Sequence, residues 1–361
     1  MFHPAGWGGW MYTIDDIVNT TIAFQAGGFQ EARGGSGWGM YYVENIKEEL
    51  NAPREWFVDA KTNELLVIPE AGTDIASALV ETGELDRLIE VTGSQADPVK
   101  DVQFVGLTLT QTRPTFMDSH EVPSGGDWSI HRGGAVYVTG AERVTVSRTL
   151  FDQVDGNGIM FADYTMDCEV SYSEFSYVGD SCVLTVGSAL LGDGRSGTQP
   201  TNTQVIGNYM HNWGVWTIQT AAFFEAISRS SNFTGNVAHG GPRAGINYND
   251  GFYGGSTMYN NVIWNVVLQS GDHGNLNSWF RDVHVYADEE GQAQSVPITH
   301  DVSYNLLIRS SFLSTSANLY NLDHDDGSSN YYDHHNALIY GGVKFRDGLD
   351  KSARFNIVTF P

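Results

Sequence analysis

The segment Val205-Ile-Gly-Asn208-Tyr-Met-His211 recurs in altered form along the second half of the chain. Its Asn returns in Phe233-Thr-Gly-Asn236-Val-Ala-His239, Met258-Tyr-Asn-Asn261-Val-Ile-Trp264, Val302-Ser-Tyr-Asn305-Leu-Leu-Ile308, Asp333-His-His-Asn336-Ala-Leu-Ile339 and the shorter Arg354-Phe-Asn356-Ile-Val. In two earlier copies, Ser147 and Ser173 stand at this position. A motif that returns at intervals of a few tens of residues is typical of a repeat architecture.

The spacing and composition of the copies predict which repeat architecture this is. Consecutive copies lie 20 to 44 residues apart, and most of these intervals bracket one rung of a three-sided β-helix. Short apolar runs at 144–146, 158–161 and 182–186 suit strands that are buried on one face, and helical periodicity is nearly absent. The sequence therefore predicts an all-β fold, a right-handed parallel β-helix, over residues 101–361.

The recurring Asn has a structural explanation. An Asn at a tight turn tolerates left-handed dihedrals, and its amide can bond to its copy in the next rung. We therefore expect a ladder rather than contacts with a substrate. The longest interval, between Asn261 and Asn305, must leave the solenoid as a loop, and the polar run Ala287-Asp-Glu-Glu-Gly-Gln-Ala-Gln-Ser295 has the composition for it.

Residues 1–100 have a different pattern and are expected to form a β-rich insertion packed on the solenoid. We expect a short helix over 41–50 and a hairpin at Lys61-Thr-Asn-Glu64. At the other end, Ile357-Val-Thr-Phe360 has no polar cap, which suggests a fragment or a chain that other residues or a partner complete.

Composition excludes several classes of function. The 361 residues contain 19 basic and 43 acidic side chains, so the net charge of −24 disfavours nucleic acid as a partner. Cys168 and Cys182 are too few for a disulfide framework, and we expect buried core thiols. No apolar run is long enough to span a membrane. No signal peptide is readable at the start, and an extracellular or periplasmic location is the expectation; the oligomeric state stays open.

The acidic residues gather in motifs that follow the Asn turns of successive rungs. The candidate catalytic carboxylates are Asp250, Asp272, Asp282, Asp323 and Asp325. Strands in neighbouring rungs lie roughly 4.8 Å apart, so these carboxylates are expected about 5 to 10 Å apart on one side of the solenoid. A glycosidase needs two carboxyl groups at such a separation, one protonated and one ionised.

Other polar and aromatic residues of these motifs are candidates for substrate binding. They are Arg243, Tyr248, Asn249, His273, Trp279, Arg281 and His324. The Asp-Gly pairs at 250–251 and 326–327 also suit simple turns. The triplet Asp323, Asp325 and Asp326 with His324 could instead bind Ca²⁺; otherwise we expect no metal and no cofactor.

Three motifs resemble the right-handed β-helix glycoside hydrolases of family 141, a group of α-L-fucosidases and xylanases. They are Arg243-Ala-Gly-Ile-Asn-Tyr-Asn-Asp-Gly251, Gly271-Asp-His-Gly-Asn-Leu-Asn-Ser-Trp279 followed by Arg281-Asp282, and Asp325-Asp-Gly-Ser-Ser-Asn330. The resemblance implies hydrolysis by a carboxylate pair, carried here by Asp282 and one of Asp323 or Asp325, with Asp250 and Asp272 as neighbours. The sequence departs from the family pattern at His324, where an apolar residue is expected.

Three functions are compatible with these features. The leading hypothesis is a glycoside hydrolase that cleaves a plant or algal polysaccharide. The alternatives are a Ca²⁺-dependent polysaccharide lyase and a non-catalytic carbohydrate-binding or adhesin-like β-helix. The lyase would use a basic residue near the acidic ones, for which the candidates are Arg243, Arg281, Lys344 and Arg346. A lyase leaves unsaturated ends that absorb ultraviolet light, whereas a hydrolase leaves only reducing ends.

Overall fold

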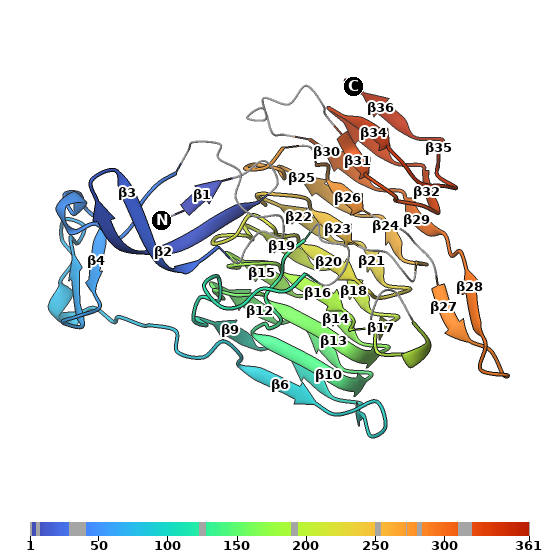
Figure 1. Ribbon diagram of the computed structural model, residues 1–361, viewed down its shortest axis with the longest axis horizontal. Coiled ribbons are helices and arrows are strands. Elements are labelled where there is room, and N and C mark those ends of the chain that lie inside the picture. The colour runs from blue at the N-terminus through green and yellow to red at the C-terminus, as the bar shows by residue number, and fades with distance from the viewer. Residues whose placement is uncertain are drawn as a thin grey trace.

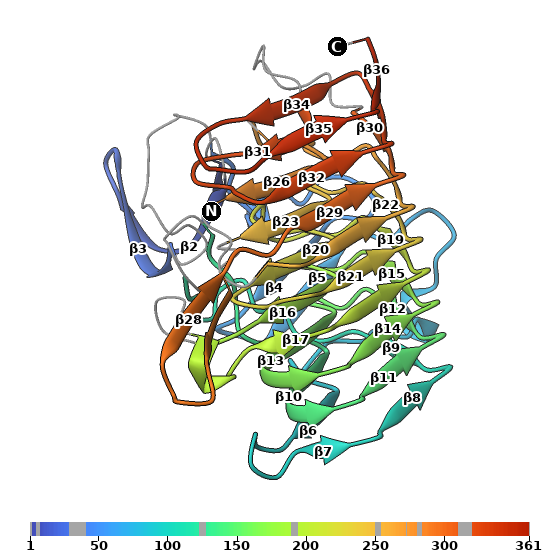
Figure 2. The ribbon, with the colours of Figure 1, turned by 90° about the vertical axis from the view of Figure 1, so that its right-hand side faces the viewer.

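The chain forms the predicted all-β fold, a right-handed parallel β-helix, in which three parallel sheets wrap around one core (Figure 1). The computed structural model describes residues 2–4, 8–28, 41–122, 128–188, 194–249, 254–271, 273–279, 284–309 and 320–360. Each rung takes strands from the three sheets in turn, and the rungs stack along one axis (Figure 2).

The strands of the three sheets follow one another regularly along the chain. Sheet 1 contains β6 (Ile89–Thr92), β7 (Val99–Lys100), β10 (Val136–Glu142), β13 (Ile159–Met166), β16 (Val183–Val186), β17 (Pro200–Thr201), β20 (Phe223–Ala226), β23 (Ile246–Asn249), β26 (Leu276–Trp279), β31 (Tyr320–His324) and β34 (Gly342–Phe345). Sheet 2 contains β8 (Gln103–Val105), β11 (Thr145–Ser147), β14 (Glu169–Ser171), β18 (Gln204–Ile206), β21 (Asn232–Thr234), β24 (Thr257–Tyr259), β29 (His300–Ser303), β32 (Tyr331–His334) and β35 (Ser352–Arg354). Sheet 3 contains β9 (Thr108–Thr110), β12 (Leu150–Asp152), β15 (Glu174–Ser176), β19 (Tyr209–His211), β22 (Val237–His239), β25 (Val262–Trp264), β30 (Leu306–Ile308), β33 (Ala337–Ile339) and β36 (Ile357–Thr359).

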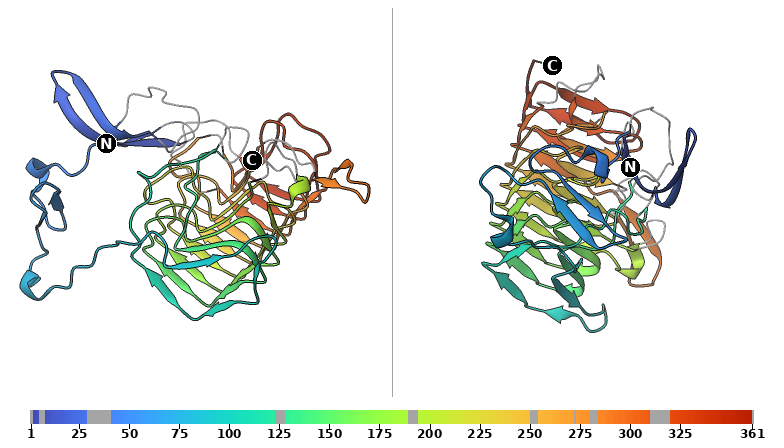
Figure 3. Two further views of the ribbon diagram at one scale, coloured as in Figure 1. Left: turned by 60° about the horizontal axis from the view of Figure 1, so that its bottom comes forward. Right: turned by 90° about the vertical axis from the view of Figure 1, so that its left-hand side faces the viewer.

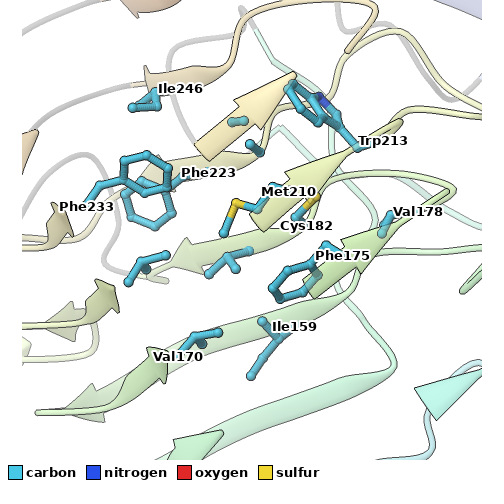
Figure 4. Close-up of a cluster of buried hydrophobic side chains, with 14 of the residues drawn as sticks. Ile159, Val170, Phe175, Val178, Cys182, Met210, Trp213, Phe223, Phe233 and Ile246 are labelled. Carbon is cyan, nitrogen blue, oxygen red and sulfur yellow. The ribbon is translucent and has the colours of Figure 1, made fainter. Parts of the chain in front are cut away.

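Registered columns of apolar side chains fill the interior. In sheet 2 the central residues of successive strands are paired, so Val170, Val205 and Phe233 stack in one column. Figure 4 shows part of this core, where Phe175 and Met210 of sheet 3 face Phe223 and Phe233 from the other two sheets. All of these side chains are fully buried, which is the main source of stability for a solenoid whose rungs do not fold singly.

The predicted Asn ladder is confirmed. The backbone N–H of Asn208 donates to Oδ1 of Asn236 at 2.9 Å, and the same bond links Asn236 to Asn261 at 2.8 Å. It continues through Asn305 and Asn336 to Asn356. These side chains are buried or nearly so, so the ladder ties the rungs together inside the turn between sheets 2 and 3.

Two details of the expected ladder are wrong. Ser147 ends β11, and the ladder position of that rung is Thr149, whose backbone N–H donates to Oγ of Ser173 at 3.1 Å. The left-handed residue of each turn is the one before the Asn, as at Gly207 (φ 66°) and Asn260 (φ 56°). The Asn therefore provides the hydrogen bonds of the ladder, while the residue before it adopts the left-handed conformation.

The loop expected between Asn261 and Asn305 leaves the solenoid as an antiparallel hairpin. It consists of β27 (His284–Ala287) and β28 (Ala293–Val296), and it projects beside the stacked rungs (Figures 1 and 2). The ladder bond from Asn261 to Asn305 is 2.9 Å long despite this excursion.

The N-terminal part contains small separate β-structures. Strands β1 (Phe2–Pro4), β2 (Gly9–Val18) and β3 (Thr21–Gly27) form an antiparallel sheet, and β4 (Trp56–Asp59) pairs with β5 (Glu64–Val67) in the expected hairpin. Figure 3 shows the hairpin away from the solenoid. The helix expected over 41–50 is only a 3₁₀ turn, η1 (Lys47–Glu49); two others are η2 (Ile75–Ser77) and η4 (Gly194–Ser196).

Contacts tie the two parts of the chain together. Met11 of β2 packs on Ile218, close to Phe116 and Trp216 of the solenoid. Strands β6 and β7 pair with β10, so the solenoid already begins at about residue 89, before the expected boundary at 101.

The two cysteines are free and buried, as predicted. Burial raises the pKa of the Cys168 thiol to about 11 and that of Cys182 well above its ordinary value. Across the residues that the structure describes, no helix combines the length and apolar character that a membrane crossing requires.

Candidate functional site

The outer face of sheet 1 changes from apolar to polar along the solenoid axis. One outward-facing column runs through Tyr137, Met160, Leu184, Phe224, Asn247, Asn277, Asp323 and Lys344, in register from β10 to β34. Its first four members pack under Trp128 and Ile130 in an apolar cluster. From β23 onward the column carries amides and charges, which we call the polar column (Asn247, Asn277, Asp323 and Lys344).

Asp323 begins a chain of ion pairs that reaches the surface. Nζ of Lys344 lies 3.0 Å from Oδ1 of Asp323 and 3.1 Å from Oδ1 of Asp325. Arg346 lies 3.2 Å from Asp325 and 2.7 Å from Asp326. The exposed side-chain fraction rises from 0% at Asp323 through 12% at Lys344 and 20% at Asp325 to 53% at Arg346. The innermost carboxylate is thus desolvated but paired with a cation.

The charge on Lys344 is stabilised by its carboxylate partners. Burial alone would lower the pKa of Lys344, but the charges and hydrogen bonds of Asp323 and Asp325 outweigh it and raise the pKa above the ordinary value. The negative charges of Asp325 and Asp326 likewise raise the pKa of Arg346. Both side chains therefore remain cations across the physiological range of pH.

Two amides complete the polar column. Nδ2 of Asn277 donates to Oδ1 of Asn247 at 2.8 Å, and both side chains are buried. Among the described residues, Nδ2 of Asn247 and Oδ1 of Asn277 have no hydrogen-bond partner. A buried donor or acceptor without a partner is costly, so these two atoms are suited to meet hydroxyl groups of a ligand.

Arg243 and His273 form a buried pair at the start of strands β23 and β26. Nη2 and Nε of Arg243 lie 2.8 and 3.1 Å from Nε2 of His273, and the guanidinium stacks on Trp128 at 4.1 Å. Burial, together with the charges of Arg243, Lys344 and Arg309, lowers the pKa of His273 well below its ordinary value. The imidazole is therefore neutral, accepts from Arg243, and donates through Nδ1 to Ser270 Oγ at 3.2 Å.

The structure brings some of the predicted site residues together. Asp323 and Asp325 share Lys344, while Arg243 and His273 bond directly. Asn249 and Trp279 are register partners at the ends of β23 and β26. The remaining predicted residues, Asp250, Asp272, Arg281 and Asp282, lie outside the described residues. Strands β23 and β26 lie within the first two motifs, and β31 directly precedes the third; the three strands are consecutive neighbours in sheet 1.

Two residues predicted to bind substrate lie inside the solenoid instead. Tyr248 is 1% exposed and stacks on His300 with ring centroids 5.4 Å apart. His324 is fully buried, where Nε2 lies 2.9 Å from Asp333 Oδ2 and Nδ1 lies 2.7 Å from Ser278 Oγ. The alternation of β23 and β31 turns these side chains inward, so neither can reach a substrate on the outer face.

The acidic triplet does not fit the alternative of a Ca²⁺ site. Lys344 lies between Asp323 and Asp325, and Arg346 lies between Asp325 and Asp326. His324, the fourth residue of that hypothesis, points into the core. Basic side chains already compensate these carboxylates, and a divalent cation would have to displace them.

The polar column contains residues whose role sequence reasoning missed. Lys344 was considered only as a lyase candidate, and Asn247 and Asn277 only as parts of motifs. The alternation in Gly342-Val-Lys-Phe345 places Lys344 outward once Val343 is assigned to the core. The same reasoning, applied to Ile246 and Leu276, turns Asn247 and Asn277 outward.

Comparisons with known proteins identify similar folds. No family model matches the sequence, and no curated protein does. A solved structure described as "Glycoside hydrolase" matches with a TM-score of 0.75 and 16% identity, over 99% of this chain and 67% of that chain. The complex of XylC with xylose has a TM-score of 0.45 and 8% identity, over 87% and 65% of the two chains. An alginate lyase from Paenibacillus sp. has a TM-score of 0.39 and 11% identity, over 75% and 83%.

The first of these comparisons shows a shared parallel β-helix fold. At 16% identity the first of them supports the fold alone, and the other two TM-scores are too low to carry an argument. The function has to be argued from the site itself.

Proposed function

We propose that this protein is a glycoside hydrolase that cleaves a plant or algal polysaccharide with carboxylates on the outer face of sheet 1. The observation that carries the proposal is the fully buried Asp323 held 3.0 Å from Lys344, in a column of amides on stacked strands. In this role Asp323 is the ionised carboxylate, which acts as nucleophile or activates water.

The second carboxyl group of the pair is proposed to be Asp282. This assignment follows from the resemblance to family 141, and from the position of Asp282 three residues after β26, the strand paired with β31. Asp325 bonds to both Lys344 and Arg346, and these two cations suit it better to a positioning role than to the donation of a proton.

The chemistry of Lys344 argues against a lyase that uses it as a base. A lyase with Lys344 as its base would need the neutral amine to accept a proton from the sugar, whereas the carboxylates raise the pKa of Lys344 and keep it charged. Arg346 is held charged in the same way. A hydrolase needs no such base, and its reaction here requires no metal or cofactor.

Substrate would be bound by the amides and the neighbouring polar groups. Asn247 and Asn277 each offer an atom for a sugar hydroxyl, and Trp279, half-buried at the end of β26, offers an aromatic surface. Arg243, held by His273, is proposed to position the substrate from the start of the same strands. A polymeric substrate of this kind implies action outside the cytoplasm, in an extracellular or periplasmic compartment.

The test is the release of reducing ends from plant and algal polysaccharides by the wild type and by Asp323→Asn. We expect the substitution to lower kcat/KM by roughly 10²- to 10⁴-fold, the usual contribution of such a group. Asp326→Asn is the matched control, because Asp326 is 44% exposed and pairs only with Arg346 among the described residues. Full activity of Asp323→Asn, or products with unsaturated ends, would contradict the proposal.

A further inference from the structure

A cavity lies away from the candidate site, at the turn that leads from sheet 3 to sheet 1 in the N-terminal rungs. Its volume is about 520 Å³, and its lining includes Glu81, Gln111, Gln153, Asp155 and Tyr177. Pockets of roughly 300 to 1,000 Å³ are large enough for small ligands. None of these residues takes part in the ion pairs or amide contacts of the polar column.

The wall of this cavity is built from equivalent positions of successive rungs. Gln111, Gln153 and Tyr177 are the left-handed residues directly after β9, β12 and β15, with φ of 60°, 54° and 52°. Backbone bonds link the rungs here: Gln111 N–H donates to the carbonyl of Gln153 at 3.0 Å, and Gln153 N–H donates to that of Ser176, the residue before Tyr177, at 2.9 Å. Their shared conformation turns three polar side chains outward in one row along the axis.

Residues 81–85, from the N-terminal part of the chain, form the opposite wall of the cavity. Nε2 of Gln111 donates to Glu81 at 3.1 Å, and the N–H of Arg113 donates to the carbonyl of Leu85 at 2.9 Å. Gly83 lies so close to the backbone of Thr112 that a Cβ there would come within 2.5 Å of it. Residues 81–85 are therefore fixed against the solenoid, and the cavity is a formed feature of the fold.

The chemistry of the lining points to a neutral ligand rich in hydroxyl groups. Gln111 and Gln153 provide amides, which both donate and accept, while Glu81 and Asp155 provide carboxyl oxygens that accept from hydroxyls. Tyr177 is 53% exposed and provides an aromatic ring. The lining contains two carboxyl groups and no basic side chain, so it would repel a uronic acid.

Hydrogen bonds with residues of the solenoid fix the position of Asp155. Nε1 of Trp216 donates to its Oδ1 at 3.0 Å, and its backbone N–H donates to Thr112 at 2.8 Å. Partial burial raises the pKa of Asp155, opposed by the bond from Trp216. A positioned carboxyl group that is partly shielded from water is well suited to accept hydrogen bonds from sugar hydroxyls.

We propose that this cavity is an accessory binding site for neutral sugar residues of a polysaccharide, separate from the site on sheet 1. Tyr177 precedes β16, and four strand steps separate β16 from β31, which carries Asp323. At about 4.8 Å per step the two sites lie on the order of 20 Å apart along the axis. The inference goes beyond the proposed hydrolysis, because it rests on the lining of the cavity and holds for a binding protein as well.

Calorimetric titration of the full chain tests this site. The probes are xylohexaose, mannohexaose and cellohexaose, with hexagalacturonate as the charged comparison, and the titrations use Asp323→Asn so that the probes stay intact. At least one neutral probe should bind, and Tyr177→Ala should weaken it by about tenfold, the size expected for the loss of one aromatic contact. Gln153→Ala, which removes a side chain with no bond inside the described part of the protein, should also weaken binding.

The matched control is Tyr172→Ala. Tyr172 is also exposed and left-handed (φ 50°), but it lies at the turn between sheets 2 and 3 of the same rung as Tyr177. Its replacement should leave the dissociation constant unchanged, and thermal unfolding should show all variants folded.

Three results would overturn the inference: no neutral probe binds, binding is insensitive to both Tyr177→Ala and Gln153→Ala, or hexagalacturonate binds more tightly through Tyr177. These outcomes differ from a failure of the proposed function. A protein that binds neutral probes through Tyr177 but releases no reducing ends keeps the accessory site and loses only the hydrolase proposal.

Discussion

Lys344 stands beside Asp323 in adjacent parallel strands, with Nζ and Oδ1 3.0 Å apart, and Asp323 has no exposed surface. Two residues separated in sequence by the motif Asp325-Asp-Gly-Ser-Ser-Asn330 thus meet because β31 and β34 are stacked in register. The loss of one partner from a buried ion pair costs far more than the loss of an exposed pair, because the other charge remains desolvated. We therefore expect substitution of either residue of this pair to disturb the candidate site more than substitution of its exposed ion pairs.

Lys344→Met is expected to lower activity most strongly at acidic pH. Without the ammonium group, the ionised Asp323 carboxylate loses a cation at hydrogen-bond distance and is protonated more readily. The acidic limb of the pH dependence of kcat/KM should move to higher pH by about 1 to 3 units.

Lys344→Arg and Lys351→Met are the comparisons for this variant. The arginine keeps a positive charge and should restore much of the activity at low pH. Lys351 bonds backbone carbonyls of Arg346 and Asp347 near the surface, so its loss should leave the acidic limb in place. An unchanged pH profile in a folded Lys344→Met protein would show that Asp323 does not act as the ionised group.

Asn261→Ala should destabilise the solenoid by about 2 to 4 kcal/mol, because several buried groups lose their partners together. Oδ1 of Asn261 accepts from the backbone of Asn236 at 2.8 Å, and its Nδ2 donates to Phe233 and Asn305, each at 2.9 Å. Urea unfolding measures the change. Asn260→Gly, at the exposed left-handed position next to it, should change the free energy of unfolding by less than about 0.5 kcal/mol. Equal effects of both substitutions would contradict a stabilising role of the ladder.

Glu225→Gln should raise the Tm at neutral pH and leave it unchanged in acid. Burial raises the pKa of Glu225 above its ordinary value of 4.5, although His300 and hydrogen bonds from serines such as Ser256 oppose the shift. The folded state therefore keeps a proton that the unfolded state releases, so the wild type loses stability as the pH rises above 4.5. The glutamine cannot ionise and avoids this loss.

Thermal unfolding between pH 4 and pH 8 checks this expectation about Glu225. The difference in Tm between variant and wild type should be near zero at the acidic end and should grow with pH. Glu290→Gln, in the exposed turn of the β27–β28 hairpin, should give no such pH-dependent difference. A Tm of Glu225→Gln below that of the wild type at pH 8 would show that the hydrogen bonds of the carboxylate outweigh its desolvation.

Replacement of residues 285–295 by a short Gly-Ser turn should change the Tm by less than about 4 °C. The hairpin contributes no side chain to the described hydrophobic clusters, and the ladder bond between Asn261 and Asn305 does not depend on it. Differential scanning calorimetry of the shortened chain measures the change. A large fall in Tm would mean that the hairpin, through its contact with η4, supports the rungs beside it.

The sequence was sufficient to predict the solenoid because its strongest constraint is repeated. The Asn copies mark the turn between sheets 2 and 3, where one amide per rung must satisfy buried backbone groups. The loop after Asn261 could be predicted from interval length alone. The copy at Ser147 was misaligned, because a hydroxyl is less distinctive than an amide and Thr149, two residues later, occupies the ladder position.

The candidate site was only partly predictable, because motif position does not give side-chain direction. Asp323 and His324 are adjacent in sequence, yet one faces outward to Lys344 and the other inward to Asp333. His324 and Tyr248 were predicted to bind substrate because they belong to the acidic motifs. In the structure, Ser278 and Asp333 are hydrogen-bond partners for both ring nitrogens of the buried His324. The pairing of Lys344 with Asp323 was not predicted, because no recognisable motif surrounds Lys344.

The change along the outer face of sheet 1 has an evolutionary consequence. Phe224, packed under Trp128, and Asn247, in the polar column, are register neighbours in the adjacent parallel strands β20 and β23. The strand register continues without a shift from the covered part of the face to the polar column. A lineage could therefore lengthen, shorten or shift the polar column by single substitutions, one rung at a time, while the scaffold beneath stays as it is.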